Sequence, residues 1–212
     1  MLVAISGSQG SGKTTVLNEL AGLGFSVVER KTARSVLAEF PGMTLEDIYA
    51  DIDLAVKWQD AILQRKIDDE SEHTLSDDLC FTERSYADLF TYAVMAIGKN
   101  NHKSAWVDDY YERCKKQNDR YVHTFYIQGG HFKPVSDGVR GTNQHYSTMI
   151  DVSMLAFLKQ MSRVEGRNGT WSHKYSDVTE PNVKNRVKSI LTASINHFLA
   201  ARDGRDFNDY GD

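Results

Sequence analysis

Hydrophobic positions alternate along the chain between short continuous runs and stripes with helical spacing. The continuous runs are typical of buried strands, and they predict strands at residues 1–6, 25–28, 79–82 and 121–128. The stripes recur every three or four residues and predict helices, of which the clearest cover residues 104–117, 144–161 and 182–201. Strands that alternate with helices indicate one α/β domain with a mainly parallel sheet.

Shorter signals define the ends of these elements. Thr44, with Asp47 three residues later, resembles a capping box, and the apolar stripe behind it predicts one long helix that reaches the acidic run at 68–72. We interpret that acidic run as a solvated helix end. Thr179 is the expected N-cap of the last helix, with Pro181 in its first turn. Residues 163–176 have no clear pattern and leave room for one last short strand.

The composition narrows the class of protein. The chain has 212 residues, of which 41% are hydrophobic and 25% charged, values that exclude collagen-like and low-complexity classes. We expect a single domain over residues 1–212, with a tail that frays from about 202 to 212. No apolar run reaches the roughly 18 residues of a membrane span, and the apolar start is typical of a strand rather than a signal peptide. The expected location is therefore the cytoplasm, or the host cytoplasm if a phage encodes the chain.

Cysteine and histidine indicate no further chemistry. Cys80 lies in an apolar run and Cys114 in a charged helical stretch, so we expect two reduced thiols rather than a disulfide or a metal pair. The seven histidines show neither i, i+4 spacing nor pairing with cysteine, and they predict no metal site.

A phosphate-binding motif follows the first predicted strand directly. Residues 7–14 read GSQGSGKT, which fits G-x-x-x-x-G-K-[ST] at every fixed position and lies between a strand and a helix. We expect Lys13, as an exposed loop charge, to reach the β- and γ-phosphates of ATP, and Thr14 to bind Mg²⁺. The expected nucleotide-binding residues are Gly7, Gln9, Gly10, Ser11, Gly12, Lys13, Thr14 and Thr15. The alternative is a glycine-rich turn that only caps a helix.

Carboxylates and arginines follow two further strands. Glu29 and Arg34 come after the second strand, and Glu83, Arg84 and Asp88 come after the third. Ligands bind at the carboxyl ends of the strands in open α/β sheets, so we expect these side chains to line an acceptor cleft. A carboxylate can accept a proton or hold Mg²⁺, and a guanidinium binds phosphate oxygens in pairs. Surface ion pairing is the alternative for each of these residues.

Aromatic residues near the third strand are candidates for contacts with a base. Tyr86, Phe90 and Tyr92 follow that strand closely and are better placed for a base pocket than the three tryptophans, which we expect in the core.

The chain resembles the small P-loop kinases, which include the ribosylnicotinamide kinase domain of bacterial NAD regulators and many phage nucleotide kinases. The resemblance rests on the segments GSQGSGKTT, VVERKTARS, FTERSYADLFTYA and FKPVSDGVRGT, and it covers residues 1–145. It implies a P-loop NTPase fold, a three-layer α-β-α sandwich with a mainly parallel sheet and a mobile lid, here at residues 129–143.

The family motifs transfer to particular residues. Glu29 and Arg34 match the motif after the second strand, and Asp137 and Arg140 match the D-G-x-R motif of the lid. The D-R-x-x-x-D motif after the third strand is changed in one position, with Glu83 where Asp is usual. Arg140, on a glycine-rich loop, could close over the γ-phosphoryl group and stabilise the charge that develops during transfer.

These observations predict an ATP-dependent phosphotransferase with ATP and Mg²⁺ as cofactors, acting on a small nucleotide or nucleoside. The favoured acceptor is a deoxynucleoside monophosphate in a phage-like nucleotide metabolism, because Arg34, Arg84 and Arg140 exceed what the donor phosphates need. The expected catalytic residues are Lys13, Glu29, Glu83, Arg84 and Arg140. The expected acceptor-binding residues are Glu29, Arg34, Arg84, Asp88 and Asp137, and the expected metal ligands are Thr14 and Glu83.

Three alternatives remain open. The first is a nucleoside or ribosylnicotinamide kinase, in which Glu29 or Glu83 removes a proton from a hydroxyl. The second is a kinase of hydroxymethylated bases in phage DNA, which the net charge of −4 disfavours without excluding nucleic acid as a partner. The third is an ATP-hydrolysing regulatory switch with no small-molecule acceptor. The sequence also leaves a homodimer open.

Overall fold

The computed structural model describes residues 1–28, 33–74, 78–129, 143–165 and 171–202. Its strands are β1 Leu2–Ser6, β2 Ser26–Val27, β3 Cys80–Glu83, β4 Tyr121–Ile127, β5 Arg163–Glu165, β6 Trp171–His173 and β7 Tyr175–Val178. Its helices are α1 Lys13–Gly22, α2 Ala33–Leu37, α3 Leu45–Ala50, α4 Ile52–Thr74, α5 Tyr86–Ile97, α6 Ser104–Asn118, α7 Gln144–Met161 and α8 Val183–Arg202, with a 3-10 turn η1 at Asn101–Lys103. Most of the expected lid and nearly all of the expected tail lie outside the described residues.

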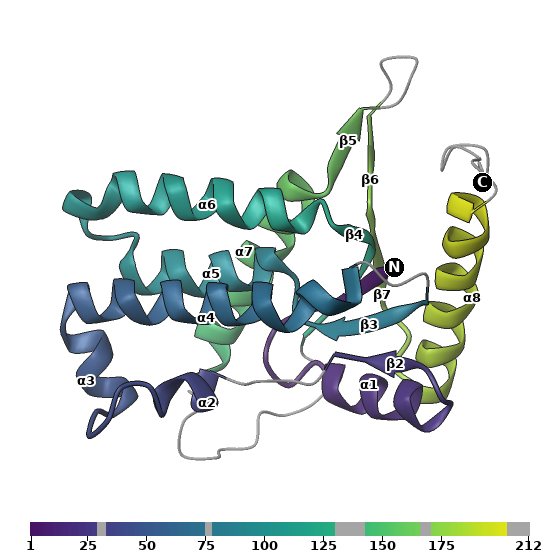
Figure 1. Cartoon of the computed structure of the whole chain (residues 1–212), viewed down its shortest axis with the longest axis horizontal. Helices are drawn as coiled ribbons and strands as arrows, with labels where there is room; N and C mark the ends of the chain where they lie inside the picture. The colour runs from purple at the N-terminus through teal and green to yellow at the C-terminus, as the bar shows by residue number, and fades with distance from the viewer. Residues whose placement is uncertain (29–32, 75–77, 130–142, 166–170, 203–212) are drawn as a thin grey trace.

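The central sheet is parallel, as the alternation of elements predicts. Within the described residues, five strands pair in the order β2-β3-β1-β4-β7, and every neighbouring pair is parallel. The carboxyl ends of these strands therefore meet at one edge. The loop after β1 and the residues after β3 are brought to that edge together (Figure 1).

Helices cover both faces of the sheet. Along β1, Val3 and Ile5 pack in one cluster with residues of α1 and α8, whereas Leu2 and Ala4 pack in another with residues of α4, α5 and α7. Both sets are buried, as expected for a parallel strand covered on two sides. α6 packs against α5 (Figure 1). The three-layer α-β-α sandwich is confirmed.

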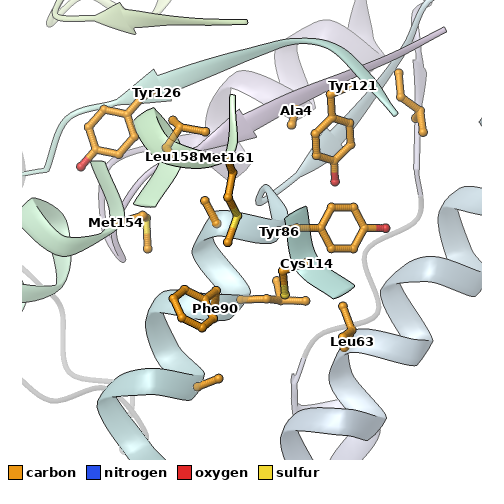
Figure 2. Packing of buried hydrophobic residues seen from close by; sticks show 14 of the residues in the cluster. Ala4, Leu63, Tyr86, Phe90, Cys114, Tyr121, Tyr126, Met154, Leu158 and Met161 are labelled. Carbon is orange, nitrogen blue, oxygen red and sulfur yellow. The ribbon is translucent and has the colours of Figure 1, made fainter. Parts of the chain in front are cut away.

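The larger core cluster contains two aromatic residues that were expected to contact a base. Tyr86 is fully buried and its ring stacks on Tyr121 with the centroids 5.5 Å apart (Figure 2). Phe90 packs edge-on against Phe157. The prediction of a base pocket from Tyr86 and Phe90 is therefore wrong, because α5 turns both side chains away from solvent. Trp58 lies in the core, as expected.

Both cysteines are free and buried, which agrees with the sequence interpretation. Burial raises the pKa of Cys80 to about 11, and it also raises the pKa of Cys114. Neither thiol is therefore a reactive thiolate near neutral pH.

The predicted long helix is two helices. Thr44 and Asp47 form the expected capping box at the start of α3, but α3 ends at Ala50. Asp51 is extended, with φ −113° and ψ 117°, and its Oδ1 accepts hydrogen bonds from the amides of Asp53 and Leu54. Asp51 is therefore a second N-cap, and it starts α4 inside the segment that the apolar stripe predicts as one continuous helix.

The C-terminal region also differs from its prediction in two places. Asn182, rather than Thr179, caps α8, because its Oδ1 accepts from the amides of Lys184 and Asn185. Residues 163–176 contain the antiparallel pair β5–β6 and the start of β7, more strand than the sequence indicated. None of the described helices is long and apolar enough to cross a membrane.

Candidate active site

The loop between β1 and α1 takes a shape that its glycines permit. Gly7, Gly10 and Gly12 have φ values of 138°, 78° and 94°, a region that side chains disfavour. A Cβ on Gly7 would lie 2.3 Å from the carbonyl oxygen of Ile127, so the loop packs closely against the end of β4. α1 begins at Lys13, and its first amides present the positive end of the helix dipole. The loop therefore has the backbone shape and the adjoining helix N-terminus that phosphate-binding loops require.

Lys13 is not the exposed loop charge that the sequence predicted. It is the first residue of α1, only 4% of it is exposed, and its Nζ donates to the carbonyl oxygen of Ser8 at 2.7 Å and to Ser11 Oγ at 3.4 Å. The prediction is wrong because the helix starts early and turns the side chain back over the loop. The ammonium is thereby held against the backbone of the loop between β1 and α1.

The two expected metal ligands are brought together from different elements. Thr14 lies in the first turn of α1 and Glu83 ends β3, and Thr14 Oγ1 donates to Glu83 Oε2 at 3.3 Å. A hydroxyl and a carboxylate are the oxygen ligands that Mg²⁺ prefers, and Mg²⁺ usually takes few protein ligands beside phosphates and water. The described residues contain no group of three or more His, Cys, Asp or Glu that could hold a metal ion. This pair therefore suits Mg²⁺ bound together with a nucleotide.

Arg84 has a strained backbone next to this pair. Its φ is 69°, the positive-φ conformation that a non-glycine residue rarely adopts and that costs about 1–3 kcal/mol. Its guanidinium lies 5.0 Å from the centre of the Tyr92 ring, and its Nη1 is buried without a hydrogen-bond partner. Burial works against the charge, but Tyr92, Asp88 and Glu83 outweigh it and raise the pKa of Arg84. Arg84 therefore places a positive charge, with one N–H donor that has no partner among the described residues, at the carboxyl edge of the sheet.

Asp88 is buried in the first turn of α5, close to Lys13 and Arg84. Its Oδ1 accepts hydrogen bonds from Ser85 Oγ at 2.9 Å and from Ser6 Oγ, and its Oδ2 is buried without a partner. Burial raises the pKa of Asp88, and the charges of Arg84 and Lys13 oppose this rise. Asp88 thus connects the end of β1 to the residues that follow β3, beside Lys13.

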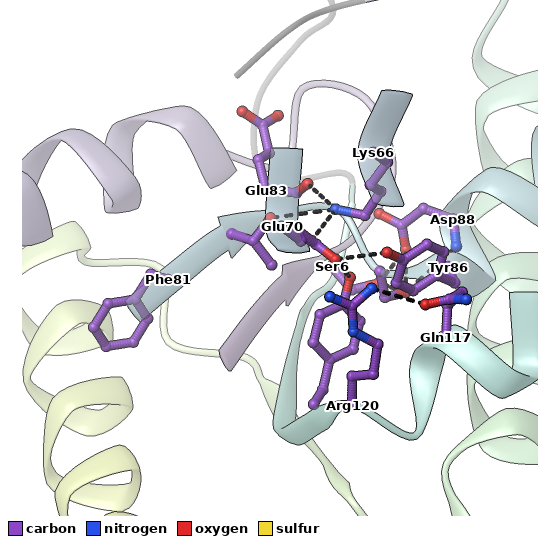
Figure 3. A network of polar contacts seen from close by, with 12 residues as sticks. Ser6, Lys66, Glu70, Phe81, Glu83, Tyr86, Asp88, Gln117 and Arg120 are labelled. Carbon is purple, nitrogen blue, oxygen red and sulfur yellow. Dashed lines mark hydrogen bonds and ion pairs between the residues drawn. The ribbon is translucent and has the colours of Figure 1, made fainter. Parts of the chain in front are cut away.

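A buried ion pair that the sequence analysis missed lies behind Glu83. Lys66 Nζ donates to Glu70 Oε1 at 2.6 Å and to the backbone oxygen of Glu83 at 3.1 Å (Figure 3). Glu70 is fully buried and also accepts from the hydroxyls of Thr82, Tyr86 and Tyr121. The interpretation of residues 68–72 as a solvated helix end is wrong for Glu70. Its i, i+4 spacing to Lys66 was the one local signal of the pair.

Four expected site residues lie wholly or in part outside the described residues. Glu29, Asp137 and Arg140 lie outside the described residues, and Arg34 belongs to α2 but its side chain is not described. Their surroundings are in part described. β2 is paired with β3 up to Val27 and Phe81, so Glu29 follows a strand next to the one that ends in Glu83. The expected lid begins at Gly129, where an added Cβ would lie 2.4 Å from Ser8 Oγ of the P-loop.

A basic groove lies at the other end of the molecule. It is lined by Lys115, Lys159, Gln160, Arg163 and His173. His173 ends β6 just before β7 starts (Figure 1). Because β7 runs parallel to β4, the groove is at the amino edge of the sheet, away from the P-loop.

Comparison with a family of sequences agrees with this geometry. A family model described as an AAA domain matches residues 2–185, most of the chain. A search of curated proteins finds no match to the chain.

Solved structures with the same fold include nucleoside kinases. The deoxyadenosine kinase of M. mycoides with bound dCTP is 14% identical, with a TM-score of 0.60 over 92% of this chain and all of that one, and the same enzyme with bound dATP is 15% identical with a TM-score of 0.60. The NadR protein in complex with NAD and AMP-PNP is 10% identical, with a TM-score of 0.61 over the whole of this chain and 51% of that one. At such identities the likeness shows a shared fold and does not assign a role.

Proposed function

The chain belongs to the AAA domain family, and we propose that it is a kinase that transfers the γ-phosphoryl group of ATP to a nucleotide or nucleoside. The observation that carries the proposal is the approach of Thr14 to Glu83 beside the P-loop. A P-loop alone fixes only the phosphoryl donor. A carboxylate and a strained, partly buried arginine beside it add the groups that transfer to an acceptor requires.

The described residues support distinct roles at the donor. The loop amides and Lys13 hold the β- and γ-phosphates, for which Lys13 exchanges its hydrogen bond to Ser8. Thr14 and Glu83 would hold Mg²⁺, which when bound neutralises charge on the phosphate oxygens. Lys66 donates a hydrogen bond to the backbone oxygen of Glu83 and so fixes the end of β3. These contacts orient the γ-phosphoryl group toward the ends of β2 and β3.

Transfer forms a bond between an acceptor oxygen and the γ-phosphorus and breaks the bond from that phosphorus to the β-bridging oxygen, so ADP leaves. We assign Arg84, whose buried Nη1 has no hydrogen-bond partner among the described residues, and Arg140 to the charge that develops on the phosphoryl oxygens during transfer. A monophosphate acceptor attacks through an ionised oxygen and has no proton to lose. A hydroxyl acceptor loses its proton to a carboxylate, which we assign to Glu29 because Glu83 already meets Thr14.

A deoxynucleoside monophosphate is the acceptor that we favour. At the described edge Lys13 and Arg84 are balanced by Glu83 and Asp88, so the extra positive charge for an acceptor phosphate would come from Arg34 and Arg140. The second candidate acceptor is a nucleoside, and the similarity to a deoxyadenosine kinase favours it.

The acceptor is identified by measuring ADP release with ATP across a panel of deoxynucleosides, their monophosphates, ribosylnicotinamide and hydroxymethylated DNA. We expect turnover with one or more deoxynucleoside monophosphates. Turnover with a nucleoside alone would replace the favoured acceptor with the second candidate. If no compound of the panel increases the rate of ADP release, the kinase proposal is contradicted.

Two arginine variants distinguish the acceptors independently. If the acceptor is a monophosphate, Arg34→Ala should raise the acceptor KM on the order of tenfold or more with the KM for ATP little changed. Arg140→Ala should lower kcat instead, by on the order of 10³-fold. An unchanged acceptor KM in Arg34→Ala, together with complete loss of activity in Glu29→Gln, would indicate a hydroxyl acceptor.

A further inference from the structure

Arg186 joins the first turn of α8 to the P-loop, 175 positions away in the sequence. Its Nη1 donates to the backbone oxygen of Ser11 at 2.9 Å, and its Nε donates to the backbone oxygen of Glu180 at 2.9 Å. The residue is fully buried. Val187 and Ile190, on the same helix, pack in one cluster with Val16 and Leu20 of α1. The arginine is therefore held on a rigid element beside the loop.

The environment of Arg186 is unusual for a structural arginine. Its hydrogen-bond partners in the described part of the chain are backbone carbonyls, and its Nη2 is buried without a partner. Burying a cation without a carboxylate against it costs stability, and here burial lowers the pKa of Arg186 while Glu180 opposes that change. A positive charge kept in this state favours an anion in the loop that it touches.

The geometry of the peptide bond gives this contact a direction. The described peptide bonds are trans, so the Gly12 N–H points opposite to the Ser11 carbonyl that Arg186 holds. In a P-loop, the amides that point into the loop bind the phosphates. A charge-assisted hydrogen bond to the carbonyl also polarises the peptide and strengthens its N–H as a donor.

We propose that Arg186 is a positioning residue for donor binding: it fixes the Ser11–Gly12 peptide so that the Gly12 amide faces the triphosphate, and it adds positive charge behind the loop. The inference rests on the proposed function only in that the donor is a nucleoside triphosphate. The inference gives α8 a role in binding the nucleoside triphosphate, although α8 lies far from the P-loop in the sequence.

Direct binding measurements test this role without any acceptor. We would titrate the wild-type protein, Arg186→Met and Arg186→Lys with a non-hydrolysable ATP analogue and with tripolyphosphate, in Mg²⁺. Arg186→Met should bind both ligands at least tenfold more weakly, because the loss concerns the phosphate cradle and not the base. Arg186→Lys keeps the charge and should recover part of the affinity. Lys188→Met, an exposed change on the same helix, is the matched control and should bind as the wild type does.

The outcomes separate this inference from the proposed function. Wild-type protein that binds neither ligand would contradict the proposed function itself. If the wild type binds both ligands and the folded Arg186 variants bind them with the same affinity, the inference alone is overturned. If Arg186→Met does not fold, Arg186→Lys decides, with weaker binding of both ligands expected and unchanged binding overturning the proposal. In kinetics the variants should raise the KM for ATP and leave the acceptor KM unchanged, a split that general loss of stability would not produce.

Discussion

At the scale of single residues, Glu83 and Arg84 lie side by side at the carboxyl edge of the sheet, next to the P-loop. Glu83 meets Thr14, and the next residue has the positive φ that strands and helices exclude. The sequence analysis selected both residues as candidates, because each belongs to a short local motif after an apolar strand. The strain of Arg84 and the burial of Lys13 were not predicted, since each depends on how β1, β3 and α1 meet in space.

The first prediction concerns the carboxylate of Glu83. Glu83→Gln removes its charge and keeps its size, so we expect the apparent affinity for Mg²⁺ in the reaction to fall on the order of 10–100-fold. The measurement is the rate as a function of Mg²⁺ concentration at saturating ATP. Glu19→Gln, an exposed change on α1, is the control and should leave the Mg²⁺ dependence as it is. A Mg²⁺ dependence that is the same in Glu83→Gln and wild type would contradict the assignment.

The second prediction separates the strain at Arg84 from its side chain. Arg84→Ala and Arg84→Gly both delete the guanidinium, but only glycine adopts a φ of 69° without penalty. We expect Arg84→Gly to be more stable to unfolding than Arg84→Ala by about 1 kcal/mol, and both variants to lose phosphoryl transfer. Urea unfolding and activity assays on the pair measure the two effects. Equal stability would show that the native backbone relaxes, and retained activity would remove Arg84 from the catalytic residues.

At the scale of elements, the pattern of the chain predicted the parallel sheet and most of its helices. Strand ends that carry polar motifs are local signals, so the sequence also indicated which loops share an edge. The ends of helices were predicted less well than the helices themselves. At Asp51 and Asn182, a side chain caps the helix through hydrogen bonds, and the apolar stripe does not show where such a cap lies. Glu70 shows the same limit, because four hydroxyl and ammonium donors from three other elements and its own helix keep it buried.

The third prediction concerns the contact between β4 and α8. His123 is buried, its Nε2 is 2.8 Å from Ser176 Oγ, and its ring stacks on His197 at 4.4 Å. Burial, with a smaller contribution from His197, lowers the pKa of His123 to about 3. Below its unfolded pKa of about 6.5 the unfolded chain binds a proton that the folded chain does not, so stability falls as the pH falls.

We therefore expect His123 to cost about 2 kcal/mol of stability between pH 7 and pH 5, at no more than about 1.4 kcal/mol per pH unit. The measurement is urea unfolding of the wild type and of His123→Phe across this range. The variant should show a shallower decline than the wild type. If the free energy of unfolding falls equally with pH in the two proteins, the folded state does not lower the pKa of His123, and this prediction is wrong.

At the scale of the whole molecule, the two edges of the sheet carry different charge patterns. The carboxyl edge holds the P-loop with the Thr14–Glu83 pair, and the amino edge holds the basic groove. A nucleic acid drawn to that groove would lie away from the P-loop, so the groove gives no support to a base within DNA as the acceptor. Arg186, on the last described helix, contacts the P-loop because α8 packs on α1, and no pattern within a short window of sequence could have indicated that contact.

The most direct test of the account is the fate of the γ-phosphoryl group. The protein is incubated with ATP labelled in that group, Mg²⁺ and the acceptor panel, and the label is followed in acceptor and in inorganic phosphate. Lys13→Met, which keeps most of the buried aliphatic stem, and Lys57→Met, an exposed control, are measured in parallel. The account predicts label in a nucleotide or nucleoside product, lost in Lys13→Met and retained in Lys57→Met. Label found only in inorganic phosphate would identify an ATP-hydrolysing switch instead, and transfer by Lys13→Met at the wild-type rate would contradict the role of the P-loop.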